Sequence, residues 1–384
     1  MIIKNGELYI NDNFIKADIV VKDKVIEYII FDISENKYAE NDNCFIDASG
    51  MYIIPGLVDI HFHGCAGVDF CDGTVESLDA ITQYQLENGI TSIVPATMTL
   101  SKKQLEKIFT NFAWYKNNEG STIRGITMEG PFISVLKKGA QNSKYILSPD
   151  IDFFKEMQGL SGNMIKQVVI APEEDKDFEF IKEISKNTTV SLAHTMANYD
   201  IADGAFKAGA THVTHLFNAM PSFNHREPSV VGAAFDNPEV FAELICDGIH
   251  IHPAVIRAMF KLFGADRICM ISDSMMATGM ADGKYMLGGQ DVEVCRKKAI
   301  LKDGTIAGSV SNLFDCLRTA VLEMKIPFKD SVRACTVTPA KSLGIDKECG
   351  CIDVGREADL IIIDKNLNIK YVIKSGRVIK NSTS

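Results

Sequence analysis

The sequence has no apolar segment long enough to cross a membrane and little positive charge. Its first residues, MIIKNGELYINDN, become polar within four positions, so they lack the apolar stretch of a signal peptide. Lysine and arginine number 40 against 50 aspartates and glutamates, the net charge is −10, and the basic residues form no extended run. This balance argues against nucleic acid or a membrane surface as a partner. We therefore expect a cytoplasmic protein that acts on a small molecule.

Several common catalytic motifs are also missing. No G-x-G-x-x-G turn follows the first predicted strand, and neither a P-loop nor a G-x-S-x-G elbow is present, which disfavours nucleotide-binding folds and serine hydrolases. The ten cysteines are scattered without framework spacing, mostly in apolar segments, as is typical of reduced thiols. A thiol enzyme using Cys65 or Cys71 near His63 is a minor alternative, because it leaves the polar residues described below without a role.

The order of apolar segments predicts an α/β protein. At 384 residues the chain exceeds the usual single-core domain, so one large barrel or two domains are expected. Residues 1–52 and 355–384 are short alternating β segments, whereas residues 53–354 alternate apolar runs with helical patterns such as SKKQLEKIFTNFAWYKNN. Eight apolar runs lie at 56–63, 90–98, 123–130, 166–173, 188–195, 211–217, 241–248 and 267–274. We predict a (β/α)8 TIM-type barrel with a small β-sandwich domain built from both termini; a doubly wound sheet is the alternative.

Side chains that bind metals follow many of these predicted strands. In a strand, residues i and i+2 share a face, so His61 and His63 of GLVDIHFHG should point the same way. Other strands end at Glu129, His194, His215, Asp247 with His250, and Asp273. Because the carboxyl ends of barrel strands meet on one face, these side chains should converge. A mixture of imidazole nitrogen and carboxylate oxygen suits Zn²⁺ or Fe²⁺.

Taken singly, each of these residues has a simpler explanation. Glu129 and Asp273 can cap helices, and His194 can be a strand-end histidine with satisfied hydrogen bonds. Only their shared position at the ends of different strands favours a site.

The remaining histidines are assigned by spacing. His212 and His215 of THVTHLFNAM would lie together on a helix but on opposite faces of a strand. We interpret this segment as a strand, which predicts His215 as the ligand and His212 as a supporting residue. His225 and His252 are expected at the surface or in supporting positions.

The chain resembles the N-acetylglucosamine-6-phosphate deacetylases, a family of the amidohydrolase superfamily, over essentially its whole length. The resemblance rests on PGLVDIHFHG, MEGPFIS, KKGAQN, AHT, THLFNAMPSFNHREP, DGIHIHP, ISDSM, GTIAGS, TVTPAKSLG and GCIDVGREADLIIID. The His-x-His opening and the ADL ending are shared across the superfamily. THLFNAMP followed by REP and DGIH is much more specific to the deacetylases.

The resemblance implies a metal-dependent hydrolase. The principal ion, Zn²⁺ or Fe²⁺, would be held by Glu129, His194 and His215. Some members replace the two histidines of the opening motif, whereas this chain keeps His61 and His63, so one or two ions per subunit are implied. Asp273 would be the general acid/base. No lysine ends a predicted strand, so Glu129 is the candidate for a bridging carboxylate.

The resemblance also implies the substrate. The acetamide of N-acetyl-D-glucosamine 6-phosphate would be hydrolysed to D-glucosamine 6-phosphate and acetate, in amino-sugar catabolism. Arg226 resembles the phosphate-binding arginine, which in the family comes from the neighbouring subunit, so a homodimer is implied. Other contacts to the sugar phosphate would come from Ala140, Gln141, Asn218, Ala219, His250, Ala307 and Gly308. Gln141 replaces a histidine of some members; it can donate a hydrogen bond but cannot carry a proton.

Three other functions remain open from the sequence. A cyclic amidase or nucleobase deaminase is disfavoured by NAMP and REP. A deacetylase of N-acetylgalactosamine 6-phosphate is not distinguished by these residues. A non-enzymatic amidohydrolase-like assembly protein would be expected to lose a metal or acid position, and none is missing.

Overall fold

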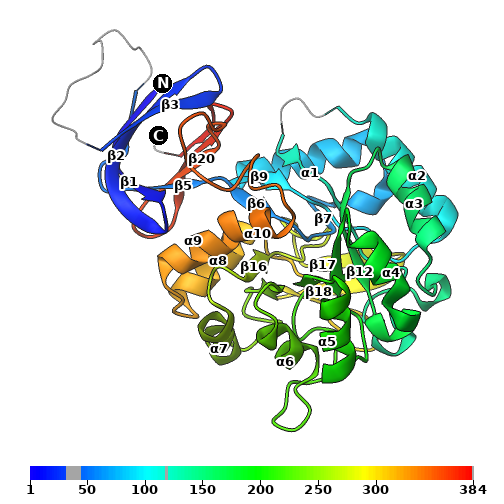
Figure 1. The fold of residues 1–384 in the computed structure, drawn as a ribbon. Coiled ribbons are helices and arrows are strands. Elements are labelled where there is room, and N and C mark those ends of the chain that lie inside the picture. Colours follow the sequence, from blue (N-terminus) through cyan, green and yellow to red (C-terminus); the bar gives the residue numbers. More distant parts are fainter. Residues whose placement is uncertain (32–44, 117–119, 383–384) are drawn as a thin grey trace.

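The two ends of the chain meet in one sheet (Figure 1). The computed structural model describes residues 1–31, 45–116 and 120–382. Among these residues the terminal sheet has the order β22-β21-β20-β5-β1-β2-β3, with β4 also paired to β1. Its strands are β1 (Ile2–Ile10), β2 (Asn13–Lys22), β3 (Val25–Ile30), β4 (Phe45–Asp47), β5 (Tyr52–Pro55), β20 (Leu360–Ile363), β21 (Ile369–Lys374) and β22 (Arg377–Asn381). Alternate apolar side chains, such as Ile19, Leu360 and Ile362, build its separate core.

Parallel strands form the centre of the molecule, and each of the eight predicted apolar runs contains one. They are β6 (Leu57–Asp59), β9 (Ile90–Ile93), β10 (Thr122–Ile123), β11 (Ile126–Met128), β12 (Ile165–Ile170), β13 (Thr189–Leu192), β14 (His212–Val213), β15 (Phe241–Ile245) and β16 (Ile268–Ile271). The ladders run β10-β9-β6 and β11 through β16 in chain order, and an Ala96–Thr127 bridge joins them. Beyond β16, the backbone N–H of Asp273 donates to His61 O at 3.0 Å, and His61 follows β6, the first of the parallel strands. The parallel sheet is therefore curled.

Helices alternate with these strands and surround them (Figure 1). They are α1 (Val75–Glu87), α2 (Lys102–Trp114), α3 (Ile151–Leu160), α4 (Glu179–Ile184), α5 (Tyr199–Ala208), α6 (Ser229–Asp236), α7 (Pro253–Phe263), α8 (Leu313–Leu322), α9 (Phe328–Cys335) and α10 (Val337–Ser342). Side-chain caps set several starts: Thr74 and Ser77 form a capping box at α1, and Asn312 caps α8. In the described part of the chain, no helix has both the length and the apolarity that a membrane span requires.

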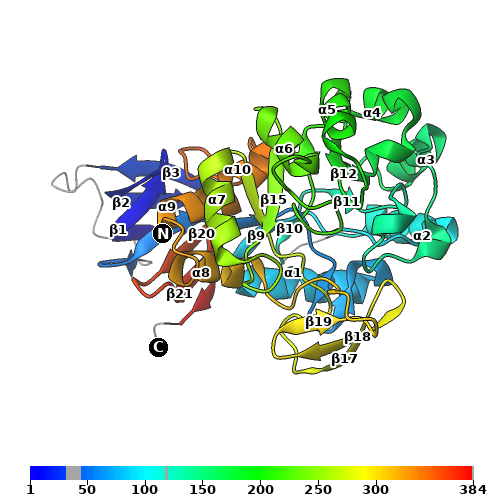
Figure 2. The same cartoon turned by 90° about the horizontal axis from the view of Figure 1, so that it is seen from below.

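Two small antiparallel elements were not among the predicted strands. A hairpin of β7 (Gly64–Cys65) and β8 (Val68–Asp69) follows His63 directly. A sheet of β17 (Gly283–Leu287), β18 (Gln290–Cys295) and β19 (Lys298–Ile300) follows β16, and Figure 2 shows it in yellow, apart from the terminal sheet. Both elements connect to segments that carry candidate site residues.

Candidate active site

The candidate site residues lie just beyond the ends of the parallel strands. Glu129 follows β11 directly, and His194, His215 and Asp273 each lie two residues after β13, β14 and β16. The strand predicted through His63 ends earlier, since β6 stops at Asp59. Beyond that point hydrogen bonds to another segment replace the strand ladder: the backbone N–H groups of His63 and Gly64 both donate to Ser274 O, at 2.7 and 3.0 Å.

Three of these residues adopt an unusual backbone conformation. His194, His215 and Asp273 have φ angles of 46°, 34° and 48°, in the left-handed region that side chains other than glycine rarely adopt. This conformation costs energy and persists only where surrounding contacts impose it. Such residues concentrate at functional sites, and here all three line one cavity.

Glu129, His194 and His215 form the first cluster. Glu129 Oε1 lies 3.2 Å from His194 Nε2 and 3.0 Å from His215 Nε2, and the two Nε2 atoms are 3.2 Å apart. His194 Nδ1 donates to the carbonyl of Lys137 at 2.9 Å, because a carbonyl oxygen can only accept. In the neutral ring this leaves the lone pair of His194 on Nε2, facing Glu129.

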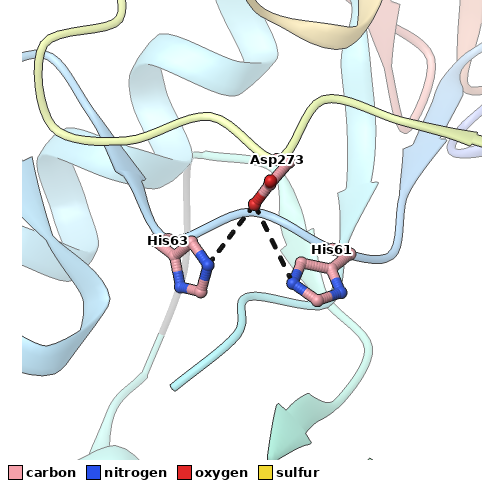
Figure 3. A group of neighbouring side chains, drawn as sticks. All are labelled: His61, His63 and Asp273. Atoms are coloured by element: carbon pink, nitrogen blue, oxygen red, sulfur yellow. Dashed lines mark ion pairs between the residues drawn. The ribbon is translucent and has the colours of Figure 1, made fainter. Parts of the chain in front are cut away.

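His61, His63 and Asp273 form the second cluster (Figure 3). Asp273 Oδ1 lies 3.4 Å from His63 Nε2 and 4.0 Å from His61 Nε2, and the carboxylate points between the two rings. Glu129 connects the clusters, with Oε1 3.5 Å from His61 Nε2 and Oε2 3.4 Å from His63 Nε2. One carboxylate therefore faces all four candidate imidazoles.

These donors fit divalent metal ions. In each cluster the three ligand atoms lie within 4.8 Å of one another, and all six residues are buried. Tetrahedral zinc with bonds of about 2.0–2.1 Å separates its ligand atoms by about 3.3 Å, close to the spacing in the first cluster. In addition, His61 Nε2 is a buried nitrogen without a hydrogen-bond partner among the described residues. A cation would satisfy it.

The carboxylates and imidazoles of the two clusters shift one another's pKa values. Burial lowers the pKa of a histidine, but the carboxylates of Glu243 and Glu129 outweigh it and raise the pKa of His61 to about 10. For His63 burial is likewise outweighed, by Asp273 and Glu129, and its pKa is raised. Burial raises the pKa of a carboxyl, yet the neighbouring histidines hold the pKa values of Glu129 and Asp273 below their ordinary range. Cations binding here would displace protons from the imidazoles.

A cavity of about 350 Å³ opens onto the two clusters. The sequence-predicted residues that line it are His63, Glu129, Ala140, Gln141, His194, His215, Asn218, Ala219, His250, Asp273 and Gly308. His61 and Ala307 are fully buried and do not line it. Arg226 is exposed on the loop before α6 and borders a different hollow, with Tyr199 and Glu227. Within one subunit, therefore, Arg226 is not brought to the clusters.

Gln141 contacts a candidate metal ligand. Its amide nitrogen donates to Glu129 Oε2 at 2.5 Å, and its amide oxygen accepts from the backbone N–H of Thr99 at 2.7 Å. The side chain is buried, so both contacts are shielded from water. A neutral amide here orients the Glu129 carboxylate without adding a charge.

Asp247 and His250 form a buried pair on the cavity wall. His250 Nδ1 lies 2.8 Å from Asp247 Oδ2, and Asp247 Oδ1 also accepts the backbone N–H of His250 at 3.0 Å. Burial opposes ionisation of both, but their mutual attraction raises the pKa of His250 and lowers that of Asp247. The pair presents the His250 imidazole to the cavity, and the Asp247 carboxylate favours the protonated form of that ring.

The sequence missed one buried acid. Glu243 lies inside β15, fully buried, with Oε2 3.2 Å from His61 Nδ1 and Oε1 3.3 Å from His212 Nε2. Its signal was a single glutamate in the apolar run FAELI, where a carboxylate is costly without partners. His212 thus contacts this carboxylate and is not in either cluster.

Two other histidines lie outside the clusters. His252 is the N-cap of α7, where its Nδ1 accepts the backbone N–H of Ala254 at 3.2 Å. His225 is exposed.

Comparison with known proteins places the chain among amidohydrolases. The sequence model of the amidohydrolase family matches residues 52–379. An N-acetylglucosamine-6-phosphate deacetylase from Bacillus subtilis (strain 168) is 35% identical over 384 residues, covering 98% of this chain and 93% of that protein. The deacetylase of the same name from Caenorhabditis elegans is 34% identical, covering 86% and 83%.

Solved structures agree. An N-acetyl-D-glucosamine-6-phosphate deacetylase variant from Mycobacterium smegmatis, in complex with N-acetyl-D-glucosamine 6-phosphate, superposes with a TM-score of 0.90. The sequences are 28% identical, and the match covers 98% of both chains.

Proposed function

We propose that this chain, which belongs to the amidohydrolase family and within it to the N-acetylglucosamine-6-phosphate deacetylases, hydrolyses the acetamide of N-acetyl-D-glucosamine 6-phosphate. The products are D-glucosamine 6-phosphate and acetate, in amino-sugar catabolism. One observation supports the chemistry most directly. Glu129, His194 and His215 converge to within 3.2 Å beside Asp273, in a cavity that can admit a small molecule.

The metal ligands in this proposal are the two clusters. Glu129, His194 and His215 would hold the principal ion, and His61 and His63 would hold a second, with Glu129 as a candidate ligand of both. Zn²⁺ and Fe²⁺ both suit this nitrogen and oxygen set. A bound cation supplies a polarised substrate carbonyl and lowers the pKa of water from about 15.7 to about 7.

Asp273 moves the proton in this mechanism. Its carboxylate faces the cavity and is ionised, since its pKa is held low, so it can accept a proton from the attacking water. The water oxygen bonds to the amide carbon, and Asp273 then returns the proton to the amine nitrogen as the carbon–nitrogen bond breaks. This step makes a neutral amine, which is a far better leaving group than an amide anion.

The other cavity residues bind the sugar phosphate. Gln141 holds Glu129, while His250, Asn218 and Ala219 line the cavity near it. Ala140 and Gly308 contribute backbone groups from the cavity wall, and the buried Ala307 supports Gly308. We propose that the chain forms a homodimer in which Arg226 reaches the phosphate across the interface. A guanidinium suits a phosphate dianion because it donates two parallel hydrogen bonds.

We also propose an architecture of two domains. Residues 53–354 form a (β/α)8 TIM-type barrel, and residues 1–52 with 355–384 a small β-sandwich domain. Support comes from the chain-order parallel strands and from the antiparallel pairing of β20 with β5. We also propose a cytoplasmic location, since the thiols lie in apolar segments as in reduced proteins.

Acetate release tests the proposal. Purified protein loaded with Zn²⁺ or Fe²⁺ should deacetylate N-acetyl-D-glucosamine 6-phosphate, and chelation should abolish this activity until metal is restored. N-acetyl-D-galactosamine 6-phosphate serves as the matched substrate. A clear preference for the galacto sugar, or no turnover of either sugar with metal bound, would contradict the proposal.

A further inference from the structure

We infer that Glu243 is a positioning residue for the second metal ion, which it serves by orienting the imidazole of His61. This inference rests on the proposed function, because it requires that His61 and His63 bind a cation. Glu243 lies one layer below the clusters, inside β15, and touches neither the cavity nor a candidate substrate position.

The contacts of Glu243 are arranged around its two oxygens. Oε2 lies 3.2 Å from His61 Nδ1 and accepts the backbone N–H of His215 at 3.2 Å. Oε1 accepts the side-chain amide of Gln167 at 2.9 Å and lies 3.3 Å from His212 Nε2. These four partners come from three segments, after β6, within β12 and at β14, so the carboxylate cannot shift without breaking several contacts.

The side chain of Glu243 is wholly excluded from water, as are those of His61 and His212. Within the described residues, no lysine or arginine forms an ion pair with Glu243. A buried carboxylate without partners is strongly destabilising. The fold retains this carboxylate, and two histidine rings lie next to its oxygens.

The consequence for His61 follows from its two nitrogens. An imidazole lone pair facing a carboxylate oxygen is repelled, whereas an N–H is attracted, so Glu243 favours the tautomer with hydrogen on Nδ1. The lone pair then lies on Nε2, which faces Glu129 and Asp273 at 3.5 and 4.0 Å. A carboxylate behind a metal-binding histidine fixes both the ring orientation and its basicity.

The role of Glu243 differs between the two ions. It contacts the ring of His61 but only the backbone of His215, whose ring belongs to the first cluster. Glutamine at position 243 keeps one acceptor oxygen for that backbone and removes the charge. We therefore expect Glu243→Gln to lower the affinity for the second ion and to leave the affinity for the principal ion largely unchanged.

Titration of Zn²⁺ into metal-free protein by calorimetry, in competition with a chelator, tests the inference. Wild-type protein should bind two ions. The Glu243→Gln variant should bind the second ion about 10–100-fold more weakly, and its affinity for the first ion should change less than about threefold. Ser191→Ala is the matched control: it removes a buried side-chain hydrogen bond, to Thr214 at 2.6 Å, in which no histidine side chain takes part. It should leave both affinities unchanged.

Three binding results would overturn the inference. One is an unchanged second affinity in Glu243→Gln; another is equal loss of both ions, which a merely structural role predicts. Uptake of a single ion by active wild-type protein would also overturn it, while leaving the deacetylase proposal intact.

A measurement on the wild type covers the case in which Glu243→Gln does not fold. In ¹⁵N-histidine NMR of the zinc-loaded protein, the His61 ring should carry its proton on Nδ1. A proton on Nε2 would refute the inference.

Discussion

Asp273 lies where the two clusters meet, with Oδ1 3.4 Å from His63 Nε2 and its carboxylate on the cavity wall. Its φ of 48° is held by backbone hydrogen bonds on both sides: its N–H donates to His61 O, and its carbonyl accepts from Ser309 N at 2.7 Å. The position of the Asp273 carboxylate is thus set by two neighbouring segments.

Asp273→Asn should abolish proton transfer while keeping an oxygen of similar size. We expect kcat to fall about 10²–10⁴-fold, because a neutral amide cannot accept the proton of water. Steady-state kinetics with metal content measured in parallel checks this. Turnover within a few-fold of wild type at equal metal content would exclude the acid/base role.

The Asp247–His250 pair should stabilise the fold in a defined pH range. The pKa of His250 is raised, so its contribution is complete below its ordinary value near 6.5 and is lost as the pH rises through the raised value. The pKa of Asp247 is lowered, so its contribution is present above about 3.8 and lost on acidification. Both contributions to stability are therefore present between about pH 3.8 and 6.5.

Urea unfolding of wild type, Asp247→Asn, His250→Gln and the double variant measures this coupling as a function of pH. The coupling free energy should be largest between about pH 4 and 6.5 and should decline at higher pH. A coupling that grows above pH 8 would show that the imidazole is neutral in the pair.

At the scale of elements, short connections position the candidate metal ligands. The β7–β8 hairpin follows His63 without a spacer, and its first residue, Gly64, donates a backbone hydrogen bond to Ser274 O at 3.0 Å. A side chain at Gly64 would place its Cβ 2.3 Å from the carbonyl oxygen of Val68. Only glycine permits this tight return of the chain beside the second cluster.

Gly64→Ala should therefore destabilise the protein by about 1–3 kcal/mol, since backbone must move to relieve the clash. Gly159→Ala is the matched control in α3, where a Cβ meets no atom within 4 Å. It should be neutral or stabilising by about 0.5–1 kcal/mol. Denaturant unfolding of both variants compares them, and equal stabilities would contradict this account of the hairpin.

At the scale of the whole molecule, the proposed phosphate-binding arginine lies away from the two clusters of its own chain. Arg226 borders a hollow separate from the cavity of Glu129 and Asp273. In a symmetric dimer the same surface is used by both subunits, so each Arg226 can complete the partner's site.

Mixing two impaired variants tests whether Arg226 completes the site of the partner subunit. Arg226→Ala should mainly raise KM, and Asp273→Asn should lower kcat, yet a hybrid dimer would contain one site with both wild-type residues. After unfolding and refolding a mixture of equal parts, activity at low substrate should recover to about a quarter of wild type if subunits pair at random. No recovery, with hybrids demonstrated by mass spectrometry, would mean that Arg226 acts within its own subunit or not at all.

The amino-acid sequence alone specified where the strands and helices of this protein lie along the chain. Apolar runs with intervening helical patterns predicted the positions of the parallel strands, because strand and helix periodicity are properties of neighbouring residues. It also determined the candidate ligands, since Glu129, His194 and His215 follow strands in motifs that belong to one family.

How those residues meet depends on long-range packing. The end of β6 before His61, the sheet of β17 to β19, and the contacts of Glu243 depend on segments far apart in the chain. Register, tautomer and burial are set by such distant partners, whose distances no local pattern contains. Physically, the chain order specifies which groups are available, and packing specifies which of them share one small volume.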